Sequence, residues 1–250
     1  MSRCATGSRI AERYFAGAYW HRAVLSALVC KTTIGGSDMF KATALLVLAV
    51  FGSAAQAHYL WIERDAKGAA RGYYGEWDNG LIEKTGGNLD KIVGPKAFLS
   101  DPAKNLAVVR QADHLAFVAS GSGDQRLTGT LTNDARKTRT TYYAKGGRTD
   151  VKGVFELELV PTKSGADEFT LLWKGAPLPK AEVTVYGPPK WKRVLSTDEQ
   201  GHVSVSTPWA GQYIVEAIHL DDKADPAALQ EREVATVSFV TTSGIRWTAK

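Results

Sequence analysis

From His58 onward the chain consists of short segments of mostly alternating apolar and polar side chains, separated by Gly, Pro, Asn and Asp. Residues 126–132 and 138–144 are rich in Thr and Tyr, which fit the half-buried surface of a pleated sheet. Alternation with a period of two is typical of β-strands, whereas a helix repeats its apolar residues every three to four positions. The sequence therefore predicts an all-β fold.

The expected strands share a short length and a turn signal at one end. They cover residues 59–63, 71–76, 96–99, 106–110, 114–119, 126–132, 138–144, 154–160, 169–173, 182–186, 192–196, 202–206, 212–219 and 234–242. In residues 154–160, Glu156 and Glu158 share one face, which we expect to be solvated.

A polar stretch at residues 161–167 contains both Pro and Gly, and it predicts a domain boundary. We expect an N-terminal β domain at residues 58–162 and a C-terminal domain at residues 168–250. Six short strands at the spacing seen in the second half favour a small immunoglobulin-like or prealbumin-like sandwich.

An export signal is predicted upstream of these strands. Met39, Phe40 and Lys41 precede an almost wholly apolar run at residues 42–51, and small residues follow up to Ala57. This order is typical of a secretory signal peptide, here residues 39–57, and it predicts a periplasmic protein. Residues 1–38 are then expected to be an upstream extension from a misassigned start; a long n-region is the alternative.

Cleavage after Ala57 would change the charge and the available ligands. Residues 1–57 hold six of the 31 Lys and Arg and two of the 26 Asp and Glu, which leaves 25 basic and 24 acidic residues. Because basic and acidic residues are almost equal in number, the sequence predicts no nucleic-acid partner. No apolar run after residue 51 is long enough to span a membrane. Both Cys and both Met would be removed, so any metal site would use imidazole, carboxylate, amine, phenol or carbonyl donors.

His58 would become the N-terminal residue of the exported chain. Its α-amino group and its side-chain Nδ1 could then chelate one metal ion, and a second imidazole would complete an arrangement similar to the histidine brace of copper-binding sandwich proteins. The alternative is an ordinary, frayed terminus.

Other candidate ligands are scattered along the chain. His219 is expected at a strand end, where sites are often built, and His114 begins a strand. His202 fits an exposed hairpin better. Glu76, with Asp78, could supply a carboxylate ligand or a hydrogen bond to a ligating imidazole, or could simply end a strand.

The sequence contains none of the common hydrolase or phosphate-binding motifs, so we expect a protein that is not an enzyme. Glu156 and Glu158 could in principle form a glycosidase pair, but a solvated strand face is the simpler interpretation.

Several short motifs occur in one order along the exported chain. They are His58-x-x-Trp61, Tyr142-x-x-Lys145, Glu158-x-Val160-Pro161, Gly175-x-Pro177-Leu178-x-x-Ala181-x-Val183, Thr197-Asp198-x-x-Gly201-x-Val203 and Gly211-x-Tyr213-x-x-x-Ala217-x-His219. In this combination the chain resembles the NikM-like family, described as the periplasmic component of a nickel transporter, and its C-terminal part is similar to Cna-B or prealbumin-like modules.

This resemblance implies a periplasmic accessory protein for metal uptake or delivery. Its partners would be a divalent transition metal (Ni, Cu or Zn, or else iron) and a separate transporter of the inner or outer membrane. We expect the metal near His58, with His219, His114 and Glu76 as further candidate ligands. Two other interpretations remain open: a structural or binding β-sandwich module without metal, and a copper-dependent oxidase.

Overall fold

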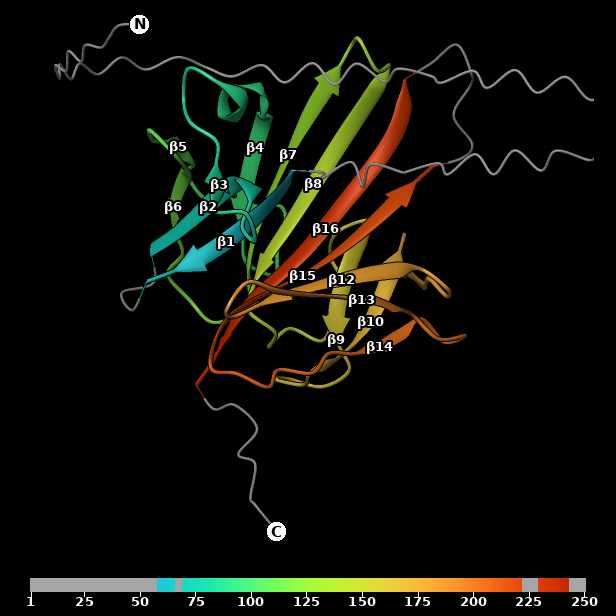
Figure 1. Cartoon of the computed structure of the whole chain (residues 1–250). Coiled ribbons are helices and arrows are strands. Elements are labelled where there is room, and N and C mark those ends of the chain that lie inside the picture. The colour runs from blue at the N-terminus through green and yellow to red at the C-terminus, as the bar shows by residue number, and fades with distance from the viewer. Residues whose placement is uncertain (1–57, 66–68, 222–228, 243–250) are drawn as a thin grey trace, which may run out of the picture. The chain divides into compact units, whose positions relative to one another are not determined.

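The structure is a computed structural model that describes residues 58–65, 69–221 and 229–242. The predicted extension and signal peptide, residues 1–57, lie outside these ranges. Within them the chain is all-β, which confirms the fold class predicted from alternation (Figure 1). The one helical element there is the short 3-10 helix η1 (Asn88–Lys91), and no described helix is long and apolar enough to cross a membrane.

The strands follow the predicted segments closely, with two additional strands of two residues each, β3 and β11. Their bounds are β1 (Tyr59–Arg64), β2 (Ala69–Glu76), β3 (Leu81–Ile82), β4 (Val93–Phe98), β5 (Val109–Arg110), β6 (Leu115–Val118), β7 (Gln125–Asn133), β8 (Thr138–Gly146), β9 (Leu157–Pro161), β10 (Glu168–Trp173), β11 (Ala176–Pro177), β12 (Glu182–Gly187), β13 (Trp191–Ser196), β14 (His202–Ser204), β15 (Gly211–Leu220) and β16 (Gln230–Thr241).

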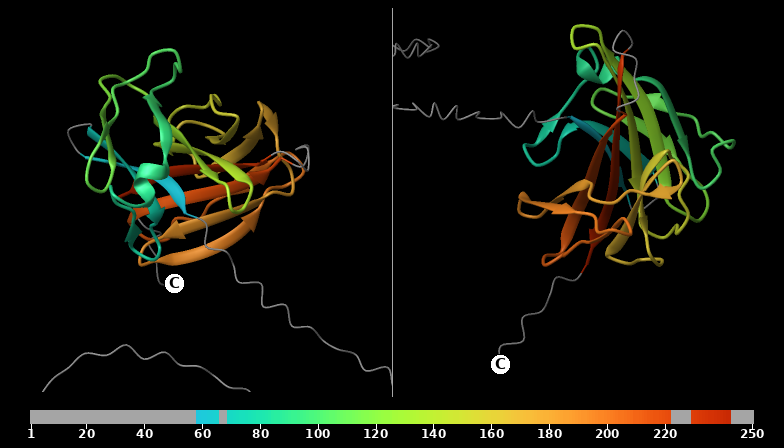
Figure 2. Two further views of the ribbon diagram at one scale, coloured as in Figure 1. Left: turned by 90° about the horizontal axis from the view of Figure 1, so that it is seen from above. Right: turned by 90° about the vertical axis from the view of Figure 1, so that its right-hand side faces the viewer.

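A seven-stranded sheet contains the longest strands, in the order β13-β12-β15-β16-β8-β7-β4 (Figures 1 and 2). Its neighbouring strands are antiparallel except for β16 and β8, which are parallel and pair Val234 with Tyr142. Because β8 and β16 are far apart in the sequence, their pairing joins the two halves of the chain at the centre of the sheet.

Two smaller antiparallel sheets complete the fold. One has the order β1-β2-β6-β5, with β3 beside β2. In the other, β10 pairs with β9 along one edge and with β11 and β14 along the other.

The two small sheets cover opposite faces of the seven-stranded sheet. On β16, Thr236 and Ser238 point to one face, where their hydroxyls donate hydrogen bonds to the carbonyls of Leu60 (2.6 Å) and Ile62 (2.7 Å) in β1. Ala235 and Val237 point to the other face, because neighbouring strand residues alternate. They pack there with apolar residues of β9 and β10. The seven-stranded sheet is therefore the middle of three layers.

The stretch predicted as a domain boundary is the turn between β9 and β10. These strands form a hairpin that pairs Pro161 with Phe169 in one sheet. The seven-stranded sheet also takes β4, β7 and β8 from one side of this stretch and β12, β13, β15 and β16 from the other. Pro, Gly and polar residues favour a hairpin turn as much as a linker, so composition alone does not separate the two.

Glu158 is buried, contrary to the solvated face predicted for it, whereas Glu156 is exposed. The Glu158 carboxylate lies 3.0 Å from Nη2 of Arg126 and 3.3 Å from Nζ of Lys145, both of which are also buried. It accepts two further hydrogen bonds from backbone N–H groups at 2.6 and 2.9 Å. The alternation of β9 was recognised correctly, but both of its faces meet protein.

Candidate functional site

The N-terminal meander of three strands assembles a cluster of one imidazole and two carboxylates. His58 precedes β1, and β1 pairs with β2 so that Tyr59 lies opposite Gly75, which places His58 beside Glu76. After the turn at residues 77–80, β3 returns along β2 and pairs Gly75 with Ile82. This brings Glu83, the next residue, to the same place.

The two carboxylates face different nitrogens of the His58 ring. Nε2 lies 2.6 Å from Oε1 of Glu83, and Nδ1 lies 3.3 Å from Oε1 of Glu76. An ionised carboxylate can only accept, so Nε2 donates its proton to Glu83. Asn88 donates to Glu83 at 2.8 Å and Asn79 donates to Glu76 at 2.7 Å, which fixes both carboxylates.

The cluster is largely buried. The exposed fraction of the side chain is 25% for His58, 11% for Glu76 and 15% for Glu83. Burial raises the pKa of the Glu83 carboxyl, but the hydrogen bonds from Asn88 and His58 and the nearby positive charge of Lys91 outweigh it. The pKa of Glu83 therefore lies below its ordinary value, which favours the ionised acceptor.

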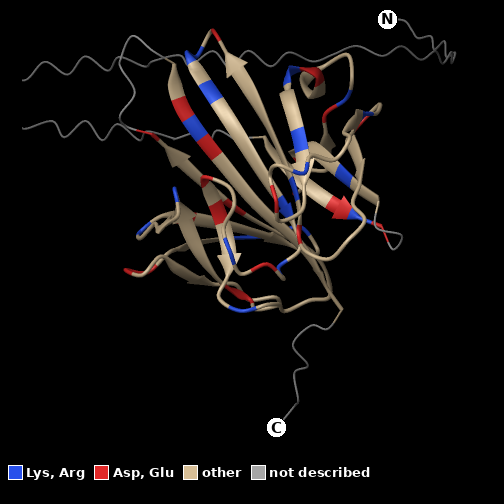
Figure 3. Ribbon diagram, turned by 180° about the vertical axis from the view of Figure 1, so that it is seen from behind, with Lys and Arg blue, Asp and Glu red and all other residues tan. Residues whose placement is uncertain are grey.

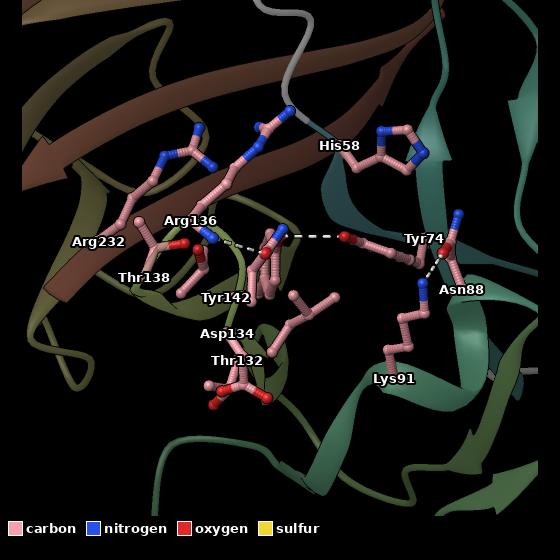
Figure 4. A pocket seen from close by; sticks show the side chains of 13 residues that line it. His58, Tyr74, Asn88, Lys91, Thr132, Asp134, Arg136, Thr138, Tyr142 and Arg232 are labelled. Carbon is pink, nitrogen blue, oxygen red and sulfur yellow. Dashed lines mark hydrogen bonds between the residues drawn. The ribbon is translucent and has the colours of Figure 1, made fainter. Parts of the chain in front are cut away.

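A pocket of about 690 Å³ opens beside His58 (Figure 4). Its floor comes from β7, β8, the turn between them and β16, and its wall from His58 just before β1, from β2 and from η1. The lining residues are His58, Tyr74, Asn88, Lys91, Leu131, Thr132, Asn133, Asp134, Arg136, Thr138, Thr140, Tyr142 and Arg232.

Two tyrosines close the inner end of this pocket. The hydroxyls of Tyr74 and Tyr142 lie 3.0 Å apart and share a hydrogen bond, and their rings meet edge to face at 5.3 Å. Burial is the main cause that raises the pKa of both phenols, so both stay neutral and able to donate a hydrogen bond. The His58 ring lies 5.3 Å from the Tyr74 ring and so joins this aromatic wall.

The chain matches no family model, no curated protein and no solved structure.

The structure does not bring the other candidate histidines to His58. His219 lies in β15 with its ring 4.3 Å from Trp173, on the face that packs against β9 and β10. It shares this face with Tyr213, Val215 and Ala217, as the alternation predicts. His58 and His219 therefore lie on opposite faces of the seven-stranded sheet.

His114 and His202 also lie apart from the cluster. Nδ1 of His114 is 2.6 Å from Asp113, and its ring lies 5.6 Å from Tyr73, which points to the opposite face of β2 from Tyr74. His202 begins β14, where it lies 3.9 Å from Asp198. Asp78 accepts a hydrogen bond from Tyr59 at 3.1 Å.

Of the four predicted metal ligands, the structure places only His58 and Glu76 together. Among the described residues, no group of three or more His, Cys, Asp and Glu side chains is arranged to hold a metal ion. A metal ion at His58 would thus need a donor other than these side chains, and the α-amino group of a processed N-terminus is such a donor.

Glu83, Arg136 and Arg232 were not among the residues predicted from the sequence. A signal for Glu83 was present: the turn at Asp78-Asn79-Gly80 implies a hairpin that returns residues 81–83 along β2. The two arginines carry no such local signal, because the parallel pairing of β8 and β16 brings them together.

Proposed function

We propose that this chain is an exported accessory protein that binds a divalent transition metal at His58 and delivers it to a separate transporter. One observation carries the proposal: the His58 imidazole is held between two carboxylates at different separations. The predicted signal peptide and the resemblance of the motifs to NikM-like proteins also support it.

The shorter separation fits a hydrogen bond and the longer one fits a shared metal ion. Metal–donor bonds of about 2.0–2.1 Å place two ligand atoms on one ion about 2.9–3.4 Å apart. The 2.6 Å between Nε2 and Glu83 is below this range, whereas the 3.3 Å between Nδ1 and Glu76 lies within it. The metal would therefore be bound on the Nδ1 side of the ring.

Glu83 would orient the ligating ring. A proton held on Nε2 by Glu83 leaves the lone pair of Nδ1 free for a metal, and carboxylate–histidine–metal arrangements of this kind are common in metal sites. Cleavage after Ala57 would add the α-amino nitrogen of His58 to the same side of the ring. The complete set would be two nitrogens of His58 and one oxygen of Glu76.

Three protein donors would leave a coordination position open for exchange, as delivery to a transporter requires. Nitrogen and oxygen donors suit Cu(II), Ni(II) and Zn(II), and Cu(II) binds such sets most tightly. The biological metal would then be decided by supply rather than by the site alone.

The test uses the full chain, exported with its own N-terminal segment and checked by mass for a terminus at His58. Titration calorimetry with Cu(II), Ni(II) and Zn(II) should give at least one Kd below about 1 μM. A matched protein with one Gly added before His58 should bind the same ion at least about 100-fold more weakly, because the α-amino nitrogen becomes an amide.

His219→Ala serves as the control variant, since it removes an imidazole from the opposite face of the sheet. Its affinity should equal that of the parent protein. Equal binding with and without the added Gly would reject the proposed ligands, and no ion bound below about 1 μM would reject the function.

A further inference from the structure

The pocket beside His58 also has an excess of positively charged lining residues, which the metal proposal does not use. Its lining contains three cationic side chains, Lys91, Arg136 and Arg232, against one carboxylate, that of Asp134. The remaining polar lining consists of hydroxyl, amide and imidazole groups, most of which can donate hydrogen bonds. The pocket thus favours a ligand rich in negatively charged oxygen atoms.

The two pocket arginines lack the carboxylate partner that four of the seven other described arginines have. Arg110, Arg126, Arg139 and Arg148 each lie within 4.0 Å of a carboxylate oxygen. Figure 3 shows acidic and basic segments side by side on β8 and β16, where Arg139 pairs with Glu231. Arg136 and Arg232 have no such partner among the described residues.

Their placement suits a single ligand. Arg232 pairs in register with Thr140, one strand away, and Arg136 comes from the turn that joins β7 to β8. Figure 4 shows both arginines on one side of the pocket, with His58 and Lys91 across from them. An oxyanion between the two sides could accept hydrogen bonds from cationic side chains on both sides of the pocket.

We propose that this pocket binds a small organic anion with two or more carboxylate or phosphate groups, held by Arg136 and Arg232. Guanidinium groups recognise these oxyanions through paired hydrogen bonds. A volume of about 690 Å³ lies in the range of pockets for organic ligands and exceeds the need of one inorganic ion. Thr138, Thr140 and Tyr142 add hydroxyl donors on the floor.

The experiment uses the full exported chain, stripped of metal with an immobilised chelating resin, because soluble chelators are themselves polycarboxylates. Citrate, succinate, a sugar bisphosphate and inorganic phosphate are titrated by calorimetry at about 50 mM ionic strength, where charge interactions are only partly screened. At least one organic polyanion should bind more tightly than inorganic phosphate, and its affinity should fall as salt is added.

Arg136→Gln and Arg232→Gln should each raise the Kd of that ligand about 10- to 100-fold, as expected for a lost charged hydrogen bond. Arg232→Lys should cause a smaller rise, since the charge stays and the paired geometry is lost. Arg193→Gln removes an exposed arginine outside this lining and should change nothing.

Binding that both Gln variants leave unchanged would overturn the proposal, and so would the absence of millimolar or tighter binding by every probe. Tighter binding of inorganic phosphate than of every organic probe would also overturn the proposal that the ligand is an organic anion. The protein with Gly added before His58 separates the two sites: it should keep the anion and lose the metal.

Discussion

Glu76 and Glu83 contact one imidazole ring from two sides, and at the scale of single residues this division of roles can be tested. Glu76 is proposed as a ligand and Glu83 as the acceptor that orients the ring. Both carboxylates are held by an asparagine, so a glutamine can replace either one without leaving a gap.

Glu83→Gln should weaken metal binding about 10- to 100-fold, because the amide is a poorer acceptor for the Nε2 proton. Glu76→Gln should weaken it at least as much, because it removes a charged ligand. Titration calorimetry measures both. Glu199→Gln, at a residue whose side chain is 68% exposed, is the control that should bind as the parent does. Equal affinity in all three variants would contradict both assignments.

Glu216 gives a prediction about stability and pH. Burial is the main cause that raises the pKa of Glu216 to about 7, although Tyr186 donates a hydrogen bond to it at 2.8 Å. The folded state thus holds a proton that the unfolded chain releases near pH 4.5. The contribution of Glu216 to the free energy of unfolding is therefore largest below that pH and falls as the pH rises toward 7, by on the order of 3 kcal/mol.

Urea unfolding at about pH 5 and about pH 8 measures this fall. In Glu216→Gln the fall should be smaller, since the buried amide never ionises. Some decline will remain, because burial also raises the pKa of Glu233 to about 7. An unchanged fall in the variant would show that Glu216 ionises at its ordinary pKa in the folded protein.

At the scale of elements, the short pairing of β3 with β2 carries Glu83 to His58. Gly75 makes this possible: its φ is +148°, and a Cβ there would lie 2.2 Å from the carbonyl oxygen of Leu81. No side chain fits between these two strands.

Gly75→Ala should therefore lower the free energy of unfolding by about 1–3 kcal/mol, because backbone atoms must shift. It should also weaken metal binding, since β3 moves away with Glu83. Gly86→Ala is the matched control: its φ is +84°, but no atom lies within 4 Å of the added Cβ. It should cost some stability and leave the affinity unchanged; equal loss of affinity in both would refute the role of β3.

At the scale of the whole molecule, the seven-stranded sheet makes the two halves of the chain interdependent. Residues 58–162 contribute β4, β7 and β8, and the later residues contribute the other four strands. The pairing of β9 with β10 and of β8 with β16 also crosses from one half to the other. Separation of the halves would therefore leave unpaired strand edges in two sheets.

The full chain should therefore unfold in one cooperative transition when followed by calorimetry. Residues 58–162 and 168–250, produced separately, should lack cooperative unfolding, whereas co-expression of both pieces should restore a folded complex. Two independent transitions that match those of the isolated pieces would instead support separate domains.

Local patterns predicted much of the fold and part of the site. Alternation located fourteen of the sixteen strands, and the two that it missed are only two residues long. The sequence also identified His58 and Glu76 as candidate ligands, and the structure places these two side chains together. His219 was assigned correctly to a face of β15, but the sequence does not show that this face is turned away from His58.

The sequence by itself determined where the strands run and, through the absence of Cys and Met after residue 57, which donor atoms a site could use. Only the tertiary structure decided which faces meet water, as Glu158 shows, and which distant strands lie side by side. The physical reason is that alternation records the period of a strand but not its neighbours. The pairing of β16 with β8, which completes the pocket beside His58, is a contact between segments almost a hundred residues apart.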